Sequence, residues 1–184
     1  VIIPLNQSGI EFMRLATWNV NGLRARIDYI DHWLKDRQPD VVGLQELKTP
    51  DDVFPHDHFR ALGYEALVHG QKSWNGVAIL AKHPMTLKQQ GLQKQEDFGA
   101  RLITAEITTP KGNVFDFTTV YCPNGKTSIF EPKGKVIIVC AGYMVPTFLR
   151  VYPRNPMKTK NKFSYTATTI SQKGIHQTHG RVQS

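Results

Sequence analysis

The chain has 184 residues, 40% hydrophobic and 10% aromatic, which is enough for one domain with a substantial core. Its longest apolar run, residues 136–141, is far too short for a membrane span, so we expect no membrane-spanning helix. The net charge of +8 lies within residues 127–184, where nine Lys and Arg face one acid, whereas residues 1–126 are neutral. The basic balance therefore favours polyanion contact only by the C-terminal third.

Three segments differ in composition. Residues 1–12 lack the basic start and long apolar centre of a signal peptide, and we expect them to be an extension before the natural start. A partial domain over 13–145 and a basic, largely irregular tail over 146–184, rich in Thr, Lys, Asn and Gln, should follow. Cys122 and Cys140 each end a β-type run, which favours two reduced thiols of a cytoplasmic protein over a disulfide.

The first patterned region predicts a β-α-β unit. Residues 13–19 form a strand pattern that ends at the turn signal Asn21-Gly22. Apolar residues at helical spacing predict an amphipathic helix over 26–37, and residues 41–45 are a short, apolar strand. This arrangement is typical of an α/β fold with its active groups at strand ends.

Weaker patterns continue to residue 140. We expect an irregular helix over 51–62, broken by Pro55, and a hairpin turn over 109–113. The remaining predicted elements are strands, at residues 64–68, 76–81, 101–108, 114–121 and 135–140.

Polar side chains end both strands of the β-α-β unit. Asn19 closes the first strand, and Glu46 follows the second. A lone carboxylate at a strand end is more often a helix cap or a surface charge, and asparagines are common in turns. Two such residues in one β-α-β unit favour a Mg²⁺ site, because Mg²⁺ prefers a few carboxylates, oxygen ligands and retained waters.

Five stretches within residues 13–126 form an ordered set of motifs: Trp18-Asn-Val-Asn-Gly-Leu-Arg-Ala25, Pro39-Asp-Val-Val-Gly-Leu-Gln-Glu46 with Lys48, Gly70-Gln-Lys-Ser-Trp-Asn-Gly-Val-Ala-Ile-Leu80, Ala100-Arg-Leu-Ile-Thr-Ala-Glu106 and Val120-Tyr-Cys-Pro-Asn-Gly125. In order and spacing they resemble the exonuclease III type of AP endonuclease, in the wider endonuclease/exonuclease/phosphatase superfamily. The Asn-Gly-Leu-Arg and Gln-Glu-x-Lys patterns favour this branch over the superfamily's lipid and inositol phosphatases.

The resemblance implies a fold and a site. The fold would be the N-terminal portion of a four-layered α/β sandwich, two stacked β-sheets flanked by helices, incomplete on its C-terminal side. Mg²⁺ or Mn²⁺ would be held by Glu46 with Asn19 nearby, and Tyr121 would lie beside the scissile phosphate. Without the resemblance, Tyr121 is an ordinary strand residue and Trp74 an ordinary loop aromatic. The residues implied to be catalytic are Asn19, Glu46 and Tyr121, and those implied to face DNA or border the site are Arg24, Lys48, Asn75 and Arg101.

The C-terminal part departs from the family pattern. The family takes an Asp and an Asn from a Gly-Asp-x-Asn strand end, and an Asp-His pair near its C-terminus. Here no acid follows Glu131, and Gly142 and Met144 stand where the Asp and Asn of that strand end would be. We therefore expect a truncated or degenerate copy, with weak or absent activity.

The resemblance also implies a function. It is metal-dependent phosphodiester hydrolysis at abasic sites and 3′ ends of duplex DNA, with double-stranded DNA as partner and no obligate protein partner. The alternative is a non-catalytic, basic nucleic-acid-binding protein, or an inactive truncated product.

Overall fold

A computed structural model describes residues 13–92, 96–121, 136–140, 147–152, 162–171 and 174–183. The predictions for residues 1–12, Cys122, Gly142 and Met144 lie outside these ranges. No helix among the described residues combines the length and apolar character that a membrane span requires.

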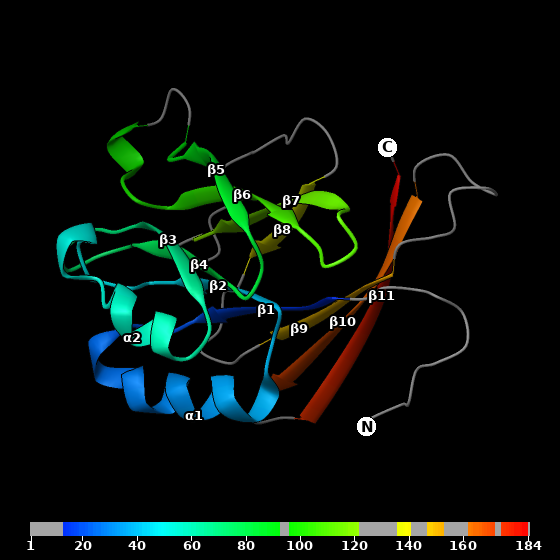
Figure 1. Ribbon diagram of the computed structural model, residues 1–184, viewed down its shortest axis with the longest axis horizontal. Coiled ribbons are helices and arrows are strands. Elements are labelled where there is room, and N and C mark those ends of the chain that lie inside the picture. The colour runs from blue at the N-terminus through cyan, green and yellow to red at the C-terminus, as the bar shows by residue number, and fades with distance from the viewer. Residues whose placement is uncertain are drawn as a thin grey trace.

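Two β-sheets form the framework (Figure 1). The seven-stranded sheet has the order β11-β10-β9-β1-β2-β4-β3, and the four-stranded sheet has the order β5-β6-β7-β8. The strands of the first sheet are β1 (Met13–Asn19), β2 (Val41–Gln45), β3 (Glu65–His69), β4 (Val77–Ala81), β9 (Thr147–Tyr152), β10 (Lys162–Ser171) and β11 (Gly174–Gln183). Those of the second are β5 (Met85–Gln90), β6 (Leu102–Thr108), β7 (Val114–Val120) and β8 (Val136–Cys140).

Both described α-helices, α1 (Ile27–Arg37) and α2 (His56–Ala61), cover one face of the seven-stranded sheet (Figure 1). Helix α1 ends where Gln38 adopts a left-handed conformation and donates its N–H to Leu34 O, and Pro39 follows. The buried side chains between helices and sheet include Trp18, Ile30, Leu34, Phe59 and Leu80. This is the amphipathic packing that the helical spacing predicts.

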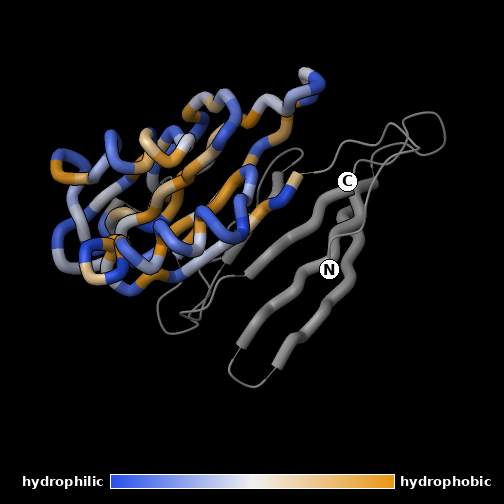
Figure 2. The backbone as a smooth tube through the Cα atoms, turned by 60° about the horizontal axis from the view of Figure 1, so that its bottom comes forward, coloured by the Kyte–Doolittle hydropathy of each residue, from blue (hydrophilic) through white to orange (hydrophobic). Residues whose placement is uncertain are grey.

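The opposite face of the seven-stranded sheet packs on the four-stranded sheet. Leu15, Val41 and Ile79 supply buried side chains from β1, β2 and β4, and the hydrophobic segments of Figure 2 concentrate on the strands of this contact. The side chains that meet them from β6 and β7 are Ile103, Ala105, Ile107 and Phe117. The two-sheet sandwich that the resemblance implies is therefore present, with helices on one outer face.

The two sheets come close together at Gly43. A Cβ atom there would lie 2.8 Å from the Cβ of Thr119, closer than real Cβ contacts allow. The absence of a side chain lets Gln45, at the end of β2, reach across and donate to the hydroxyls of Thr17 and Thr119. This buried polar contact lies directly before Glu46 and fixes the two sheets relative to each other at that end.

Most predicted elements are confirmed within one or two residues. The predicted helix over 26–37 is α1, preceded by a short 3-10 helix, Arg24–Arg26. The irregular helix predicted over 51–62 is a 3-10 turn, Asp51–Val53, followed by α2. The hairpin turn closes with Thr109 N–H donating to Asn113 O at 2.8 Å.

Two expectations differ from the structure. Strand β5 is not among the predicted strands, because its exposed, polar residues carry little pattern and its strand conformation comes from pairing with β6. The tail predicted to be largely irregular contains β9, β10 and β11. Its Lys, Asn and Gln content conceals β-favouring Phe, Tyr, Thr and Ile residues over 163–170, and β9 pairs antiparallel with β1.

Candidate active site

Asn19 and Glu46 meet at the carboxyl ends of β1 and β2. The two strands are parallel, and Asn19 pairs with Gln45, so Glu46 follows at the same edge. Asn19 Nδ2 donates to Glu46 Oε1 at 2.8 Å, and Asn19 Oδ1 accepts from the Asn21 N–H at 3.0 Å. Asn19 is buried, with 5% exposure, so its side chain is held in place and its hydrogen bond orients the Glu46 carboxylate.

The backbone around Glu46 is unusual. Five of the six described non-glycine residues with positive φ lie in the loops of this region, and this conformation costs about 1–2 kcal/mol for most residues and less for asparagine. These five residues are Asn21, Glu46, Lys48, Ser73 and Asn75. Hydrogen bonds between the loops hold them: Gly22 N–H donates to Glu46 O, and Lys48 N–H donates to Asn75 O at 3.0 Å. Strain maintained in this way is typical of functional sites.

Glu46 also contacts the ammonium group of Lys48 and the hydroxyl of Tyr121. Lys48 Nζ lies 3.4 Å from Glu46 Oε2, and the Tyr121 hydroxyl hydrogen-bonds to the carboxylate. Burial raises the pKa of Glu46, but the hydrogen bonds from Asn19, Tyr121 and Lys48 outweigh it and leave that pKa below its ordinary value. Glu46 is therefore an anion at neutral pH.

Tyr121 is held protonated by the same environment. Burial, followed by the hydrogen bond to and charge of Glu46, raises the pKa of Tyr121 to about 12. The nearby Arg101 opposes this shift. At neutral pH Tyr121 is thus a hydrogen-bond donor and not a base.

Asn75 is a link between loops. Its Oδ1 accepts from Arg101 Nε at 3.3 Å, and its Nδ2 donates to Gln71 Oε1 at 3.0 Å. Gln71 Oε1 also accepts from Ala100 N–H at 2.9 Å. A Cβ at Gly99 would collide with this oxygen, so the glycine makes room for the link. The side-chain amide of Asn75 therefore positions Arg101. A contact between Asn75 and DNA stays a prediction.

Five of the predicted site residues line a cleft of about 500 Å³, whereas Asn19 contacts Glu46 without being part of the lining. Arg24, exposed in its 3-10 helix, does not line it. Sequence reasoning missed Gln71, Asp97 and Phe98 as cleft residues, although Gln71 lies in one of the five family-like stretches and in a polar loop between two strands. The lining residues are Glu46, Lys48, Gln71, Trp74, Asn75, Asp97, Phe98, Arg101 and Tyr121.

The donor set fits a cation with few protein ligands. Among the described residues, no three His, Cys, Asp or Glu side chains converge as a metal cage would require. Mg²⁺ is commonly bound by one or two carboxylates together with water and substrate phosphates, and the ionised Glu46 supplies one carboxylate.

The coupling of Tyr121 to Glu46 gives a testable titration. Glu46→Gln removes the charge that helps raise the pKa of Tyr121, so this pKa should fall from about 12 towards its ordinary value of 10.0 without reaching it, since burial remains. Because its pKa is raised, the neutral form of Tyr121 stabilises the fold at a pH below 10.0, the ordinary pKa of tyrosine. This stability is lost as the pH rises through about 12. Phenolate absorbance after a rapid pH jump measures the change, with Tyr121→Phe identifying the signal. An unchanged titration in Glu46→Gln would contradict the contact.

Comparison with known proteins supports this assignment of the fold. The model of the Endonuclease/Exonuclease/phosphatase family matches residues 16–168, extending past the motifs that end at residue 126. The chain is 37% identical over 122 residues to an exodeoxyribonuclease III of Haemophilus influenzae, covering 66% of this chain and 45% of the relative. An exodeoxyribonuclease of Bacillus subtilis is 34% identical over 124 residues, which cover 64% of this chain and 45% of that relative. The chain thus spans less than half the length of these relatives.

Solved structures agree with the sequence comparison. The 3′ phosphatase NExo from Neisseria, bound to product DNA hairpin, is 35% identical with a TM-score of 0.55, covering 61% of this chain and 42% of that chain. An AP endonuclease from Archaeoglobus fulgidus is 32% identical with a TM-score of 0.53, and the match covers 61% of this chain and 42% of that chain. The family match over residues 16–168 shows that this chain belongs to the endonuclease/exonuclease/phosphatase family, and the chain is similar to exonuclease III-type nucleases within that family.

Proposed function

We propose that this cleft hydrolyses phosphodiester bonds at abasic sites and 3′ ends of duplex DNA, using Mg²⁺ or Mn²⁺. The observation that carries the proposal is the ionised Glu46 carboxylate, held by Asn19, Tyr121 and Lys48 in one cleft. The relatives named exodeoxyribonuclease, and the solved AP endonuclease and 3′ phosphatase, support this substrate class.

The side chains of the cleft can bind and polarise a phosphate. Lys48 and Arg101 bring positive charge into it, and Asn75 fixes the direction of Arg101. Tyr121, protonated at neutral pH, is a donor for a phosphate oxygen once it leaves Glu46. Together these groups neutralise and orient a phosphodiester.

Glu46 would hold the divalent cation, and Asn19 would keep its carboxylate in position. When bound, the cation supplies Lewis-acid stabilisation of the charge that develops on the phosphate.

Proton transfer is the weaker part of this cleft. Its described lining contains no histidine, and Asp97, the only carboxylate there besides Glu46, is exposed. Loss of a general base typically lowers a rate about 10²–10⁴-fold. We therefore infer that the 184-residue chain alone hydrolyses DNA slowly.

Incision of a duplex that contains one abasic site tests this function. With Mg²⁺ we expect slow cleavage that EDTA abolishes and added Mg²⁺ restores. Cleavage that persists in EDTA would contradict metal dependence, and rapid cleavage would contradict the impairment. A chain that never cleaves in Mg²⁺ or Mn²⁺ would contradict hydrolysis itself.

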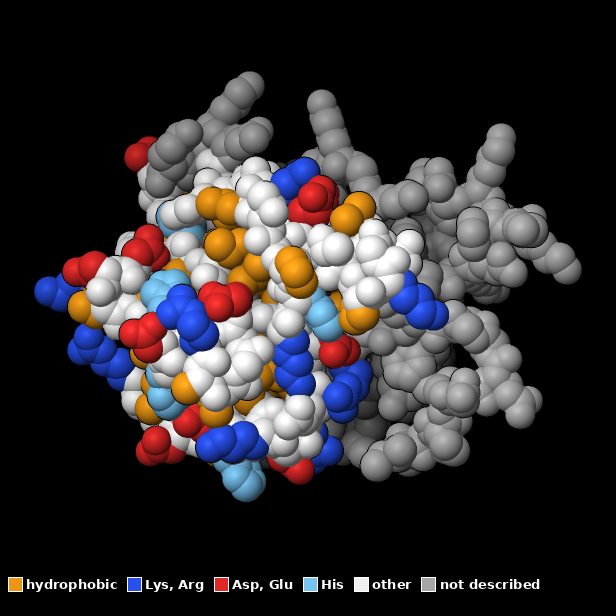
Figure 3. Space-filling model, viewed as in Figure 1, with side chains coloured by type: hydrophobic (Ala, Val, Ile, Leu, Met, Phe, Trp, Pro, Cys, Tyr) orange, Lys and Arg blue, Asp and Glu red, His pale blue; other side chains and the backbone are white. Residues whose placement is uncertain are grey.

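The distribution of charge favours a second candidate, a non-catalytic nucleic-acid-binding protein. The whole excess of +8 lies in residues 127–184, whereas opposite charges are interspersed on the described face in Figure 3. Deleting 146–184 would remove β9 from β1, so charge substitution is the cleaner experiment.

The double substitution Lys158→Gln and Lys160→Gln should reduce the salt dependence of DNA binding. Each lost phosphate contact lowers the slope of log affinity against log salt by about 0.9, so the slope should fall by about 2. Fluorescence anisotropy over a salt series measures it. The matched control is Lys88→Gln with Lys111→Gln, on β5 and in the turn between β6 and β7. Equal slopes in both double variants would sink this candidate.

A further inference from the structure

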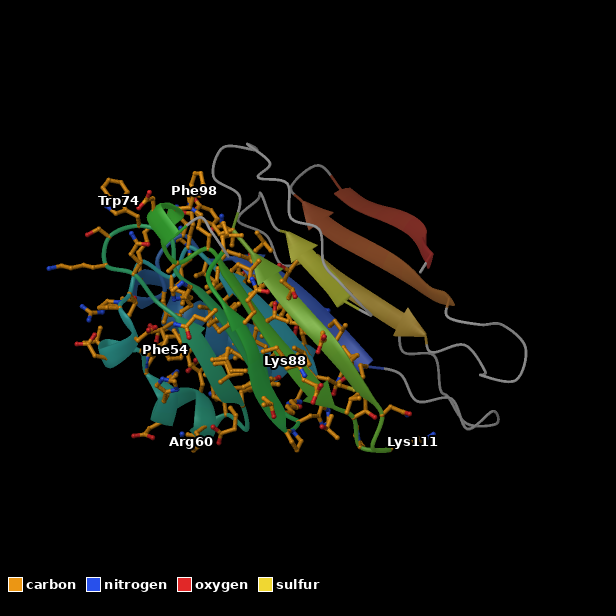
Figure 4. All side chains as sticks on the ribbon, turned by 90° about the horizontal axis from the view of Figure 1, so that it is seen from above. Phe54, Arg60, Trp74, Lys88, Phe98 and Lys111 are labelled. Carbon is orange, nitrogen blue, oxygen red and sulfur yellow. The ribbon has the colours of Figure 1, made fainter. Side chains whose placement is uncertain are left out.

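Two exposed aromatic side chains stand at the rim of the cleft. Trp74 is 70% exposed and Phe98 is 45% exposed, whereas Trp18 and Trp33 are buried in the core. Figure 4 shows Trp74 and Phe98 projecting from the same end of the sandwich, with Lys111 at a distance from them. Both line the cleft that contains Glu46. Large apolar side chains left exposed at a cleft are typical of ligand-binding surfaces.

The loops that carry these rings are fastened to each other. Asn75 Nδ2 donates to Phe98 O at 3.4 Å, and Gly76 N–H donates to Ala100 O at 2.9 Å. Trp74 N–H donates to Lys72 O at 2.9 Å within its own turn. The rings therefore project from preorganised loops, which lowers the entropy cost of binding a ligand.

The neighbouring charges identify the ligand class. Arg101 Cζ lies 5.5 Å from the centroid of the Phe98 ring, and Arg101 and Lys48 line the same cleft. Positively charged side chains bind the phosphates of a nucleic acid, and aromatic side chains stack on its bases whatever the nucleotide sequence. Cations beside exposed aromatic rings therefore suit a phosphate with a neighbouring nucleobase. A cleft of about 500 Å³ falls within the usual range of small-ligand sites, about 300–1,000 Å³.

We propose that Trp74, with Phe98 beside it, forms a stacking platform for one unpaired nucleobase next to the phosphate at Lys48 and Arg101. The proposal rests on the proposed nucleic-acid substrate and adds a preference within it. A paired base inside a duplex has both faces covered by its neighbours and a terminal pair exposes only its outer face, so an unpaired base is the one that can turn out of the stack onto an aromatic side chain. The platform therefore selects DNA with an unpaired 3′-terminal nucleotide.

The experiment compares two duplexes of equal charge in EDTA, so that no cleavage occurs. Each has one unpaired 3′-terminal residue, which carries a base in one duplex and is abasic in the other. Trp74→Ala should weaken binding of the base-bearing duplex about 5- to 150-fold and leave the abasic duplex unchanged. Trp74→Tyr should restore most of the affinity. Tyr29→Ala, at another exposed aromatic residue, is the matched control and should change neither.

Each outcome decides the proposal. Equal losses on the two duplexes would assign Trp74 to loop structure or backbone contact and overturn the platform, as would no loss on either. Failure of the unmodified chain to bind either duplex also overturns it. Selective loss on the base-bearing duplex, without hydrolysis under any metal condition, supports the platform and overturns the proposed hydrolysis alone.

Discussion

Glu46→Gln should lower the rate of metal-dependent incision at least about 100-fold, because groups that merely support a metal ligand already contribute about 10- to 100-fold. The substitution keeps the size of the side chain and an oxygen to accept from Asn19 Nδ2. It removes the negative charge that Lys48 and Tyr121 contact. Incision of an abasic duplex in excess Mg²⁺, relative to the unmodified chain, measures the loss.

Asp97→Asn is the matched control for this prediction. Asp97 lines the same cleft but is exposed, so its loss should change the rate only a few-fold. Binding of Mn²⁺, followed by electron paramagnetic resonance, should weaken in Glu46→Gln and not in Asp97→Asn. The reverse order of the two variants would contradict the proposed metal site at Glu46 and favour Asp97 instead.

The β-α-β unit was predictable because its signals are local and strong. Helix α1 has a clear helical period, strands β1 and β2 are short apolar runs that end in polar residues, and Pro39 follows the end of the helix. Strand β5 and the strands after residue 146 carry weak patterns, and pairing with neighbours supplies what their sequences lack. Single-sequence patterns do not report such pairing.

The same distinction applies to the site. Asn19 and Glu46 could be brought together from the sequence, because parallel neighbouring strands end at one edge. The link from Gln71 to Ala100 spans 29 residues and has no local signature. The left-handed conformations of Glu46 and Lys48 are likewise imposed by hydrogen bonds from other loops. Long-range contacts thus complete a site whose main carboxylate is locally encoded.

Trp18→Ala should destabilise the fold by about 3–5 kcal/mol, the usual cost of removing a large buried aromatic side chain. Trp18 is 2% exposed and packs against Trp33 and Tyr29, with ring centroids 5.2 Å and 5.6 Å away. A domain of this size is typically stable by only about 5–15 kcal/mol. Urea unfolding followed by circular dichroism should therefore show a large fall in the midpoint.

Tyr29→Ala is the control that distinguishes the stability lost with a buried side chain from the stability lost with a single ring contact. Tyr29 touches the same indole but is 61% exposed, so its removal should cost less than about 1 kcal/mol. Comparable losses in the two variants would contradict the assignment of Trp18 to the core. Because Trp18 directly precedes Asn19, the cavity in Trp18→Ala should also loosen the support of Glu46, and Trp18→Phe should recover part of both stability and incision.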